Sequence, residues 1–166
     1  MQDIRKTNEW QLMINDMSSV ASSLSRDYIY YMHMLAQCKV ITTEQVQTMG
    51  VSFHRDHFRM YVNYDFFMKM KPEERLGVLK HEMLHILNGH LTFKKDESKD
   101  HTMMNIATDC AINQMIIRHH LPEGCILPNT LPVKEGVVVP ENLTGEQYYG
   151  LLEKHGDEEK IGKLKA

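Results

Sequence analysis

The chain has 166 residues, of which 42% are hydrophobic and 25% are charged, and its formal net charge is −3. This length and composition are typical of one soluble globular domain with a sizeable buried core. Because the charge balance is slightly acidic, no overall basic field attracts nucleic acid or an anionic membrane, and neither is an expected partner.

The sequence carries no signal for secretion or membrane insertion. Polar residues follow Met1, and no apolar run approaches the roughly 18 residues needed to span a bilayer. The three cysteines, Cys38, Cys110 and Cys125, are widely spaced and do not form CxxC pairs. This pattern favours reduced thiols in a cytoplasmic protein over a disulfide framework.

Hydrophobic periodicity predicts helices from about residue 8 to residue 37, with a serine cluster at residues 22–25 marking a break between two of them. Short β-branched or alternating segments then predict three strands, with a hairpin turn at Arg55–His57. The predicted strands are Lys39–Thr42, Met49–His54 and Phe58–Tyr64. The first part of the chain is therefore expected to form a small sheet covered by helices.

The next predicted helix carries the pattern HExxH at residues 81–85. Pro72 near its first turn favours a helix start, and Gly89 is a stop signal. Apolar residues recur along it at spacings of three and four: Leu76, Leu79, Met83, Ile86 and Leu87. Because each helical residue turns by about 100°, His81 and His85 lie about 40° apart and can direct both imidazoles at one metal ion.

Two imidazoles on one helix face suit Zn²⁺, which in catalytic sites keeps three protein ligands and one open position. Glu82 is adjacent in sequence and can exchange a proton with water activated by the ion, as a general acid/base. The pattern therefore predicts one zinc ion per chain, with His81 and His85 as ligands and Glu82 as the catalytic residue.

A second helix is expected from about His101 to Arg118. Asn105, Asp109 and Asn113 recur on it every four residues and form a polar ridge on an otherwise apolar helix. If this helix returns antiparallel to the first, the ridge faces the two histidines. Asp109 is then the third metal ligand, and Asn113 is expected to be a packing or capping group.

His90 is the alternative third ligand. It follows His85 by five residues, which places it some 140° from the histidine face unless the helix unwinds at Gly89. Asp109 is favoured over His90 on this ground. If Asp109 instead orients a ligand histidine without touching the ion, His90 is needed to complete the site, so both assignments stay open at this point.

The C-terminal part contains prolines that predict an irregular segment from about residue 121 to residue 132, which could border a substrate cleft. Thr144–Leu152 has the pattern of a short capped helix. Residues 1–152 are therefore expected to form a single domain, and residues 153–166 a polar C-terminal tail that frays.

Five motifs taken together resemble a known family: Met49-Gly50-Val51, Lys80–His90, Asn105–Asn113, Leu121–Gly124 and Gly145–Tyr149. The set is similar to the putative metallopeptidase domain found beside von Willebrand factor A-like domains in bacterial and phage proteins. The resemblance implies an α+β, zincin-like fold in which a small mixed or antiparallel sheet packs on helices. It also implies His81 and His85 as zinc ligands and Glu82 as acid/base, with Asp109 or His90 completing the site.

The function implied is that of a zinc-dependent metallopeptidase acting on a protein or peptide substrate. A metal-dependent nuclease and a catalytically silent zincin-fold binding or assembly module are the alternatives. The acidic net charge argues against the nuclease, and the intact HExxH pattern argues against the silent module. A separate von Willebrand factor A-like domain or ATPase is a candidate partner, and the cytoplasm of a bacterial cell or a phage-infected host is the expected location.

Overall fold

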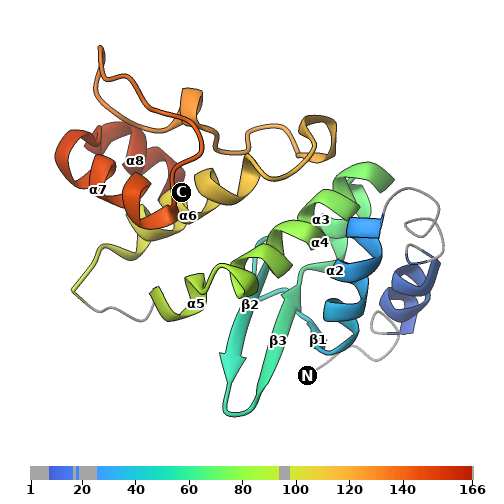
Figure 1. The fold of residues 1–166 in the computed structure, drawn as a ribbon. Helices are drawn as coiled ribbons and strands as arrows, with labels where there is room; N and C mark the ends of the chain where they lie inside the picture. Colours follow the sequence, from blue (N-terminus) through green and yellow to red (C-terminus); the bar gives the residue numbers. More distant parts are fainter. Residues whose placement is uncertain (1–7, 17, 19–25, 94–97, 166) are drawn as a thin grey trace.

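The computed structural model describes residues 8–16, 18, 26–93 and 98–165, and the statements below concern these residues. They form an α+β arrangement with a small mixed sheet, as predicted (Figure 1). A helix over residues 8–16 comes first, and the serine cluster at 22–25 lies outside the described residues. The elements that follow are α2 (Arg26–Ala36), β1 (Lys39–Thr42), β2 (Met49–His54), β3 (His57–Val62), α3 (Tyr64–Lys69), α4 (Pro72–Leu87), α5 (His90–Phe93), α6 (His101–Asn113), the 3-10 helices η1 (Arg118–His120) and η2 (Pro128–Thr130), α7 (Gly145–His155) and α8 (Glu158–Lys165).

The three strands are ordered β1-β3-β2, with β1 parallel and β2 antiparallel to the central strand β3. Strand β3 ends at Val62, earlier than predicted, because the Asn63 side chain accepts a hydrogen bond from Phe66 N and starts α3. Among the described residues β2 pairs with β3 and is an edge strand of the sheet. The hairpin between β2 and β3 turns at Arg55, whose φ is 56°, and projects away from the helices (Figure 1).

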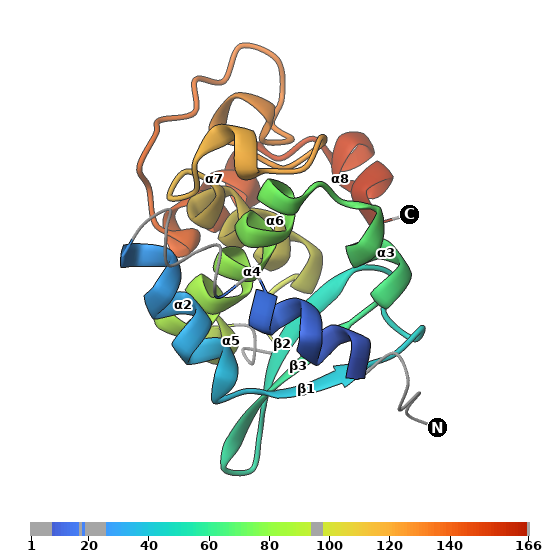
Figure 2. The same ribbon diagram turned by 90° about the vertical axis from the view of Figure 1, so that its right-hand side faces the viewer.

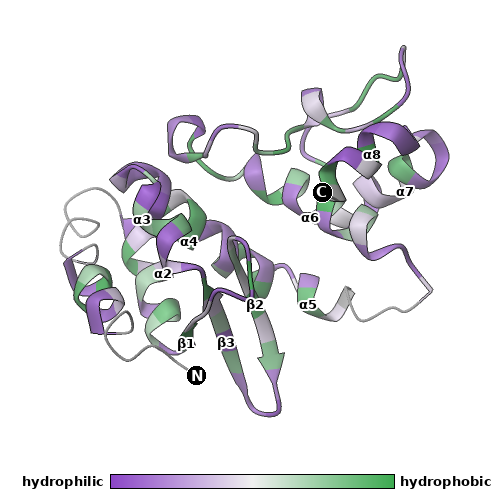
Figure 3. Ribbon diagram, turned by 180° about the vertical axis from the view of Figure 1, so that it is seen from behind, coloured by the Kyte–Doolittle hydropathy of each residue, from purple (hydrophilic) through white to green (hydrophobic). Residues whose placement is uncertain are grey.

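Helices α2 and α4 lie side by side against the sheet and enclose the first core (Figures 1 and 2). Met60 and Val62 of β3 are fully buried beneath them. Hydrophobic and hydrophilic residues are mixed along the ribbons of α4 and β3 (Figure 3). The remaining members of this core come from the N-terminal helices, α3 and α4: Trp10, Ile14, Tyr28, Met32, Leu35, Phe67, Met70, Leu76, Leu79 and Met83.

A second core joins α6, α7 and α8 to the irregular segment between residues 131 and 133. A smaller cluster connects the two cores, because Leu84 of α4 packs with Ile112, Ile116 and Leu121. Helices α4 and α6 therefore meet between the two cores. The polar faces of these two helices build the candidate site.

Two segments differ from the sequence prediction. Helix α6 ends at Asn113 instead of near Arg118, because the next bonds run three residues back, from Met115 N to Ile112 O, and the Gln114 side chain binds Cys110 O. The expected fraying tail is helix α8, in which Ile161 is buried at 4% exposure against the second core. Lys160 Nζ of the same helix donates to Val133 O at 3.1 Å, so α8 docks through this bond as well as through Ile161. Within the described part of the chain, no helix is both long enough and apolar enough to cross a membrane.

Candidate metal centre

Helix α4 carries the HExxH residues and is fixed at both ends. At its start Lys71 N donates to Glu74 Oε2 at 2.9 Å, and at its end the Asn88 side chain donates to Leu84 O at 2.9 Å. The helix buries its apolar face in the first core, which turns the opposite face toward α6. On that face the Nε2 atoms of His81 and His85 lie 3.0 Å apart. The predicted one-turn pairing of the two imidazoles is present.

Helix α6 brings Asp109 to the same point. The Asp100 carboxylate caps this helix by accepting hydrogen bonds from Thr102 N at 2.8 Å and Met103 N at 2.9 Å. Two and a half turns later, Asp109 Oδ1 lies 3.2 Å from His85 Nε2 and 3.6 Å from His81 Nε2. His81, His85 and Asp109 form a group whose candidate ligand atoms all lie within 4.8 Å of one another. The polar ridge of α6 thus faces the histidines.

The outer nitrogen of each histidine ring has its own partner. His81 Nδ1 lies 2.9 Å from Asn113 Oδ1, and His85 Nδ1 lies 3.2 Å from His90 Nδ1. These contacts leave the Nε2 atoms directed toward Asp109. The sequence predicts a packing or capping role for Asn113, and its four-residue spacing from Asp109 places it on the face that contacts His81. The contact itself depends on how α4 and α6 pack.

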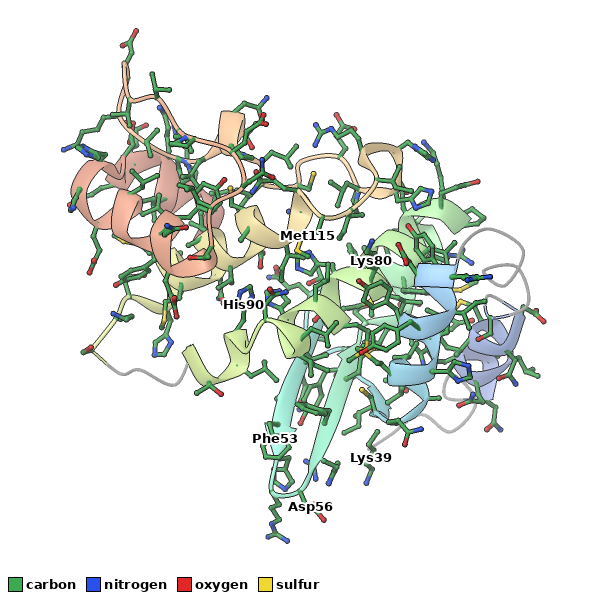
Figure 4. All side chains as sticks on the ribbon, viewed as in Figure 1. Lys39, Phe53, Asp56, Lys80, His90 and Met115 are labelled. Carbon is green, nitrogen blue, oxygen red and sulfur yellow. The ribbon has the colours of Figure 1, made fainter. Side chains whose placement is uncertain are left out.

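His90 lies at the junction of α4 and α5, on the side that faces α6 (Figure 4). Helix α4 does end before it, and Gly89 adopts a φ of 67° that favours glycine. The condition for His90 to approach the histidine pair is therefore met. Its ring nevertheless contacts the outer nitrogen of His85 and does not join the group that faces Asp109.

The charges at the centre are complementary to a cation. Burial raises the pKa of Asp109, but the hydrogen bonds from His81 and His85 and their charges together lower it by more than burial raises it. The net pKa therefore lies well below its usual range, and the carboxylate is anionic. Burial lowers the pKa of His81, whereas the hydrogen bond and charge of Asp109 and the charge of Glu82 raise it, and the net pKa is raised. A fixed carboxylate facing two imidazoles is an arrangement that a divalent cation can satisfy.

A cleft of about 600 Å³ opens beside these residues. Its walls contain Glu82, buried at 6% exposure, and the three candidate ligands. The side chains of His85, His81 and Asp109 are 6%, 16% and 34% exposed, so the group is open to solvent on its Asp109 side. Other lining residues come from Thr48 and the start of β2 (Met49, Gly50 and Val51), from the segment between η1 and η2 (Leu121, Pro122, Glu123, Gly124, Cys125 and Ile126), from helices α3, α4 and α6 (Phe66, Gly77, Val78, Asn105 and Asn113), and from Leu91 and Leu164.

The irregular segment predicted for about residues 121–132 includes residues 121–126, which form one wall of the cleft. The sequence did not predict the contributions of β2, Leu91 or Leu164 to the walls. The contribution of β2 follows from its place in the sheet, which strand patterns do not encode. That of Leu164 follows from the docking of α8 through Ile161.

Comparison with known proteins identifies the family. The model of a family described as "Putative metallopeptidase domain" matches residues 17–166. The chain belongs to this family. No curated protein matches the chain, and no solved structure matches it. The recognised family and the His81, His85 and Asp109 group both point to a metal-dependent hydrolase.

Proposed function

We propose that this chain is a zinc-dependent peptidase with a zincin-like fold, in which His81, His85 and Asp109 hold the ion and Glu82 is the general acid/base. The observation that carries the proposal is the convergence of the HExxH helix and Asp109 in one open cleft. Three protein ligands with a solvent-facing side are the pattern of a catalytic zinc site, whereas a structural site is closed by four.

The donor set fits zinc. Tetrahedral Zn²⁺ with bonds of about 2.0–2.1 Å requires ligand atoms about 3.3 Å apart. The two Nε2 atoms of His81 and His85 lie 3.0 Å apart, and Asp109 Oδ1 lies 3.2 Å from His85 Nε2 and 3.6 Å from His81 Nε2. These three distances bracket the required value. Two imidazole nitrogens and one carboxylate oxygen are also the ligand types of one established class of zinc hydrolases. When bound, the ion supplies a Lewis acid that polarises a peptide carbonyl and acidifies water.

Glu82 moves the proton. Its carboxylate lines the same cleft as the ligands and is shielded from bulk solvent. As general base it accepts a proton from the attacking water, and as general acid it delivers that proton to the nitrogen of the departing amine. Asn113 and His90 hold the outer nitrogens of the ligand rings during these steps.

The cleft walls favour a peptide over a nucleic acid. Among the residues described as lining the cleft, Glu82, Asp109 and Glu123 are carboxylates and none is Lys or Arg, so the walls lack the side chains that usually pair with the phosphates of a nucleic acid. The edge strand β2 contributes Met49, Gly50 and Val51 to the wall, where an extended peptide can add as a further strand. Apolar residues from several elements complete the walls: Met49, Val51, Phe66, Val78, Leu91, Leu121, Ile126 and Leu164. We infer that the substrate is an extended segment with apolar side chains.

Metal analysis and peptide cleavage together test the proposal. Elemental analysis should find one zinc per chain in the wild type and a strong loss in His81→Ala and Asp109→Ala. His90→Ala should keep the ion with weaker affinity, because it removes only an orienting contact. No zinc after reconstitution of the folded wild type would contradict the metal site, and full occupancy in Asp109→Ala would remove Asp109 from the ligand set.

Cleavage is measured by mass spectrometry on a peptide library and an unfolded protein. Glu82→Gln should retain zinc and lower the cleavage rate by at least about 10²-fold, because general acid/base catalysis typically contributes that much. Glu73→Gln is the matched control, since Glu73 is exposed in the first turn of the same helix. Unchanged cleavage by Glu82→Gln would refute the role of Glu82. RNA cleavage that is lost in the same variant would instead assign the nuclease function.

The partner and location remain predictions. A separate von Willebrand factor A-like domain or ATPase is the proposed partner, and the cytoplasm of a bacterial or phage-infected cell is the proposed location.

A further inference from the structure

The side chain of Asn113 joins two parts of the site that are distant in the sequence. It is buried at 4% exposure and ends helix α6. Its Oδ1 atom lies 2.9 Å from His81 Nδ1, and its Nδ2 atom lies 2.9 Å from the carbonyl oxygen of Ile126. Ile126 belongs to the 121–126 segment that forms one wall of the cleft. One amide therefore contacts both a candidate metal ligand and the cleft wall.

The chemistry of these partners determines which way the amide points. A backbone carbonyl oxygen can only accept a hydrogen bond, so the amide nitrogen of Asn113 must face Ile126 and its oxygen must face His81. That oxygen requires a proton on His81 Nδ1. The neutral ring then has its lone pair on Nε2, the nitrogen that faces His85 and Asp109. The Ile126 carbonyl thus orients the Asn113 amide so that its oxygen can accept a hydrogen bond from His81 Nδ1.

We propose that Asn113 is a positioning residue that fixes His81 in the Nδ1–H tautomer and ties the 121–126 wall of the cleft to helix α6. This inference rests on the proposed function, because it assigns to Asn113 the orientation of a metal ligand. The two tasks use different atoms of the amide and can be separated. Asn113→Ala removes both contacts, whereas Asn113→Asp keeps an acceptor for His81 and places an oxygen against the Ile126 carbonyl.

Zinc affinity and the histidine tautomer test the first task. Competition with a chromophoric chelator should show affinity about 10–100-fold weaker in Asn113→Ala, as is typical when an orienting partner of a ligand is lost, and near the wild-type value in Asn113→Asp. Asn105→Ala is the control on the same polar ridge: Asn105 is exposed and lines the cleft, but among the described residues it is Asn113 whose side chain contacts His81 and Ile126. Long-range ¹H–¹⁵N spectra should show His81 as the Nδ1–H tautomer in the wild type and in Asn113→Asp, and as a mixture in Asn113→Ala.

Amide hydrogen exchange tests the second task. Exchange at residues 121–126 should be faster in both Asn113 variants than in the wild type or Asn105→Ala. Unchanged exchange in Asn113→Asp would overturn the proposed tie to the wall. Equal zinc affinity in the wild type and Asn113→Ala, or a wild-type His81 protonated at Nε2, would overturn the positioning role.

Failure of the proposed function is a separate outcome. If the wild type takes up no zinc, the peptidase proposal fails, and the tautomer of His81 in the metal-free protein, at a pH where the ring is neutral, decides the role of Asn113. An unchanged tautomer in Asn113→Ala would then overturn it. Asn113→Ser, whose short hydroxyl reaches neither partner, replaces Asn113→Ala if that variant does not fold.

Discussion

Substituting Gly77 with alanine should destabilise the protein although alanine is the better helix former. Gly77 lies in α4 one turn before His81, where the helix packs against η1. A Cβ atom at this position would lie 2.0 Å from the backbone oxygen of His120, so α4 and η1 would have to separate by about an ångström or more. His120 cannot retreat freely, because its ring is hydrogen-bonded to the hydroxyl of buried Tyr28.

The expected loss follows from two opposing terms. Overpacking costs about 1–3 kcal/mol, and a 2.0 Å approach to a backbone oxygen belongs in the upper part of this range, about 2–3 kcal/mol. The helix propensity of alanine over glycine offsets about 1 kcal/mol of this cost. A net loss of about 1–2 kcal/mol should lower the melting temperature by about 2–8 °C for a chain of this length. The shift of η1 also moves the adjoining 121–126 wall, so peptide binding should weaken.

Thermal unfolding followed by circular dichroism measures this effect, with Gly150→Ala as the matched control. Gly150 is in the interior of α7, and a Cβ there would meet nothing within 4 Å. The same substitution at that position should stabilise the protein by about 0.5–1 kcal/mol. If Gly77→Ala proves as stable as Gly150→Ala, the close approach of α4 and η1 is incorrect.

Three further predictions concern the first core, the helix carrying Asp109, and pH. Phe67→Ala removes the ring that packs edge-on to Trp10 at 4.7 Å and should cost about 3–5 kcal/mol in chemical denaturation; unchanged fluorescence of this single tryptophan would refute the contact. Asp100→Ala should lower the free energy of unfolding by about 1 kcal/mol because it removes the cap of α6, whereas Asp100→Asn keeps a capping oxygen and should not. Equal melting temperatures of the two variants would disprove this role of Asp100. Burial raises the pKa of the Cys38 thiol to about 11, which favours the neutral thiol in the folded state. Its contribution to stability is therefore complete below about pH 8.5 and is lost as pH rises through about 11, so Cys38→Ala should flatten the alkaline fall in melting temperature.

Much of the first half of the fold was predictable because its signals are local. The strands of the sheet and the start of α4 follow from alternation and from Pro72, which act over a few residues. The placement of Asp109 opposite the histidines was also predictable, since four-residue spacing on a helix defines one face. A face can be matched to another face without knowledge of the loops between them.

The remaining features depend on tertiary contacts. The end of α6, the docking of α8 and the contact between Asn113 and Ile126 each require a partner that lies elsewhere in the chain. His90 illustrates the limit most clearly. Helix geometry indicated that it could approach the pair only if α4 ended at Gly89, but not that its ring would then meet the outer nitrogen of His85.

Removing zinc should loosen the junction between α4 and α6 more than either core. In the described part of the chain, a small buried apolar cluster of Leu84, Ile112, Ile116 and Leu121 lies at this junction, beside the polar group that we propose holds the ion. An ion bound only by the folded state stabilises it by about 2.7 kcal/mol at a free concentration 100 times the dissociation constant. For a chain of this length, chelation should then lower the melting temperature by about 5–11 °C.

The same experiment locates the effect. Amide exchange after chelation should increase around His85 and Asp109, while the core around Trp10 and Phe67 keeps its protection, because the first core contains none of the proposed ligands. His81→Ala should behave like the chelated wild type and show no further response to chelator. A melting temperature that does not depend on zinc, or uniform loss of protection across both cores, would show that the ion does not connect the two helices.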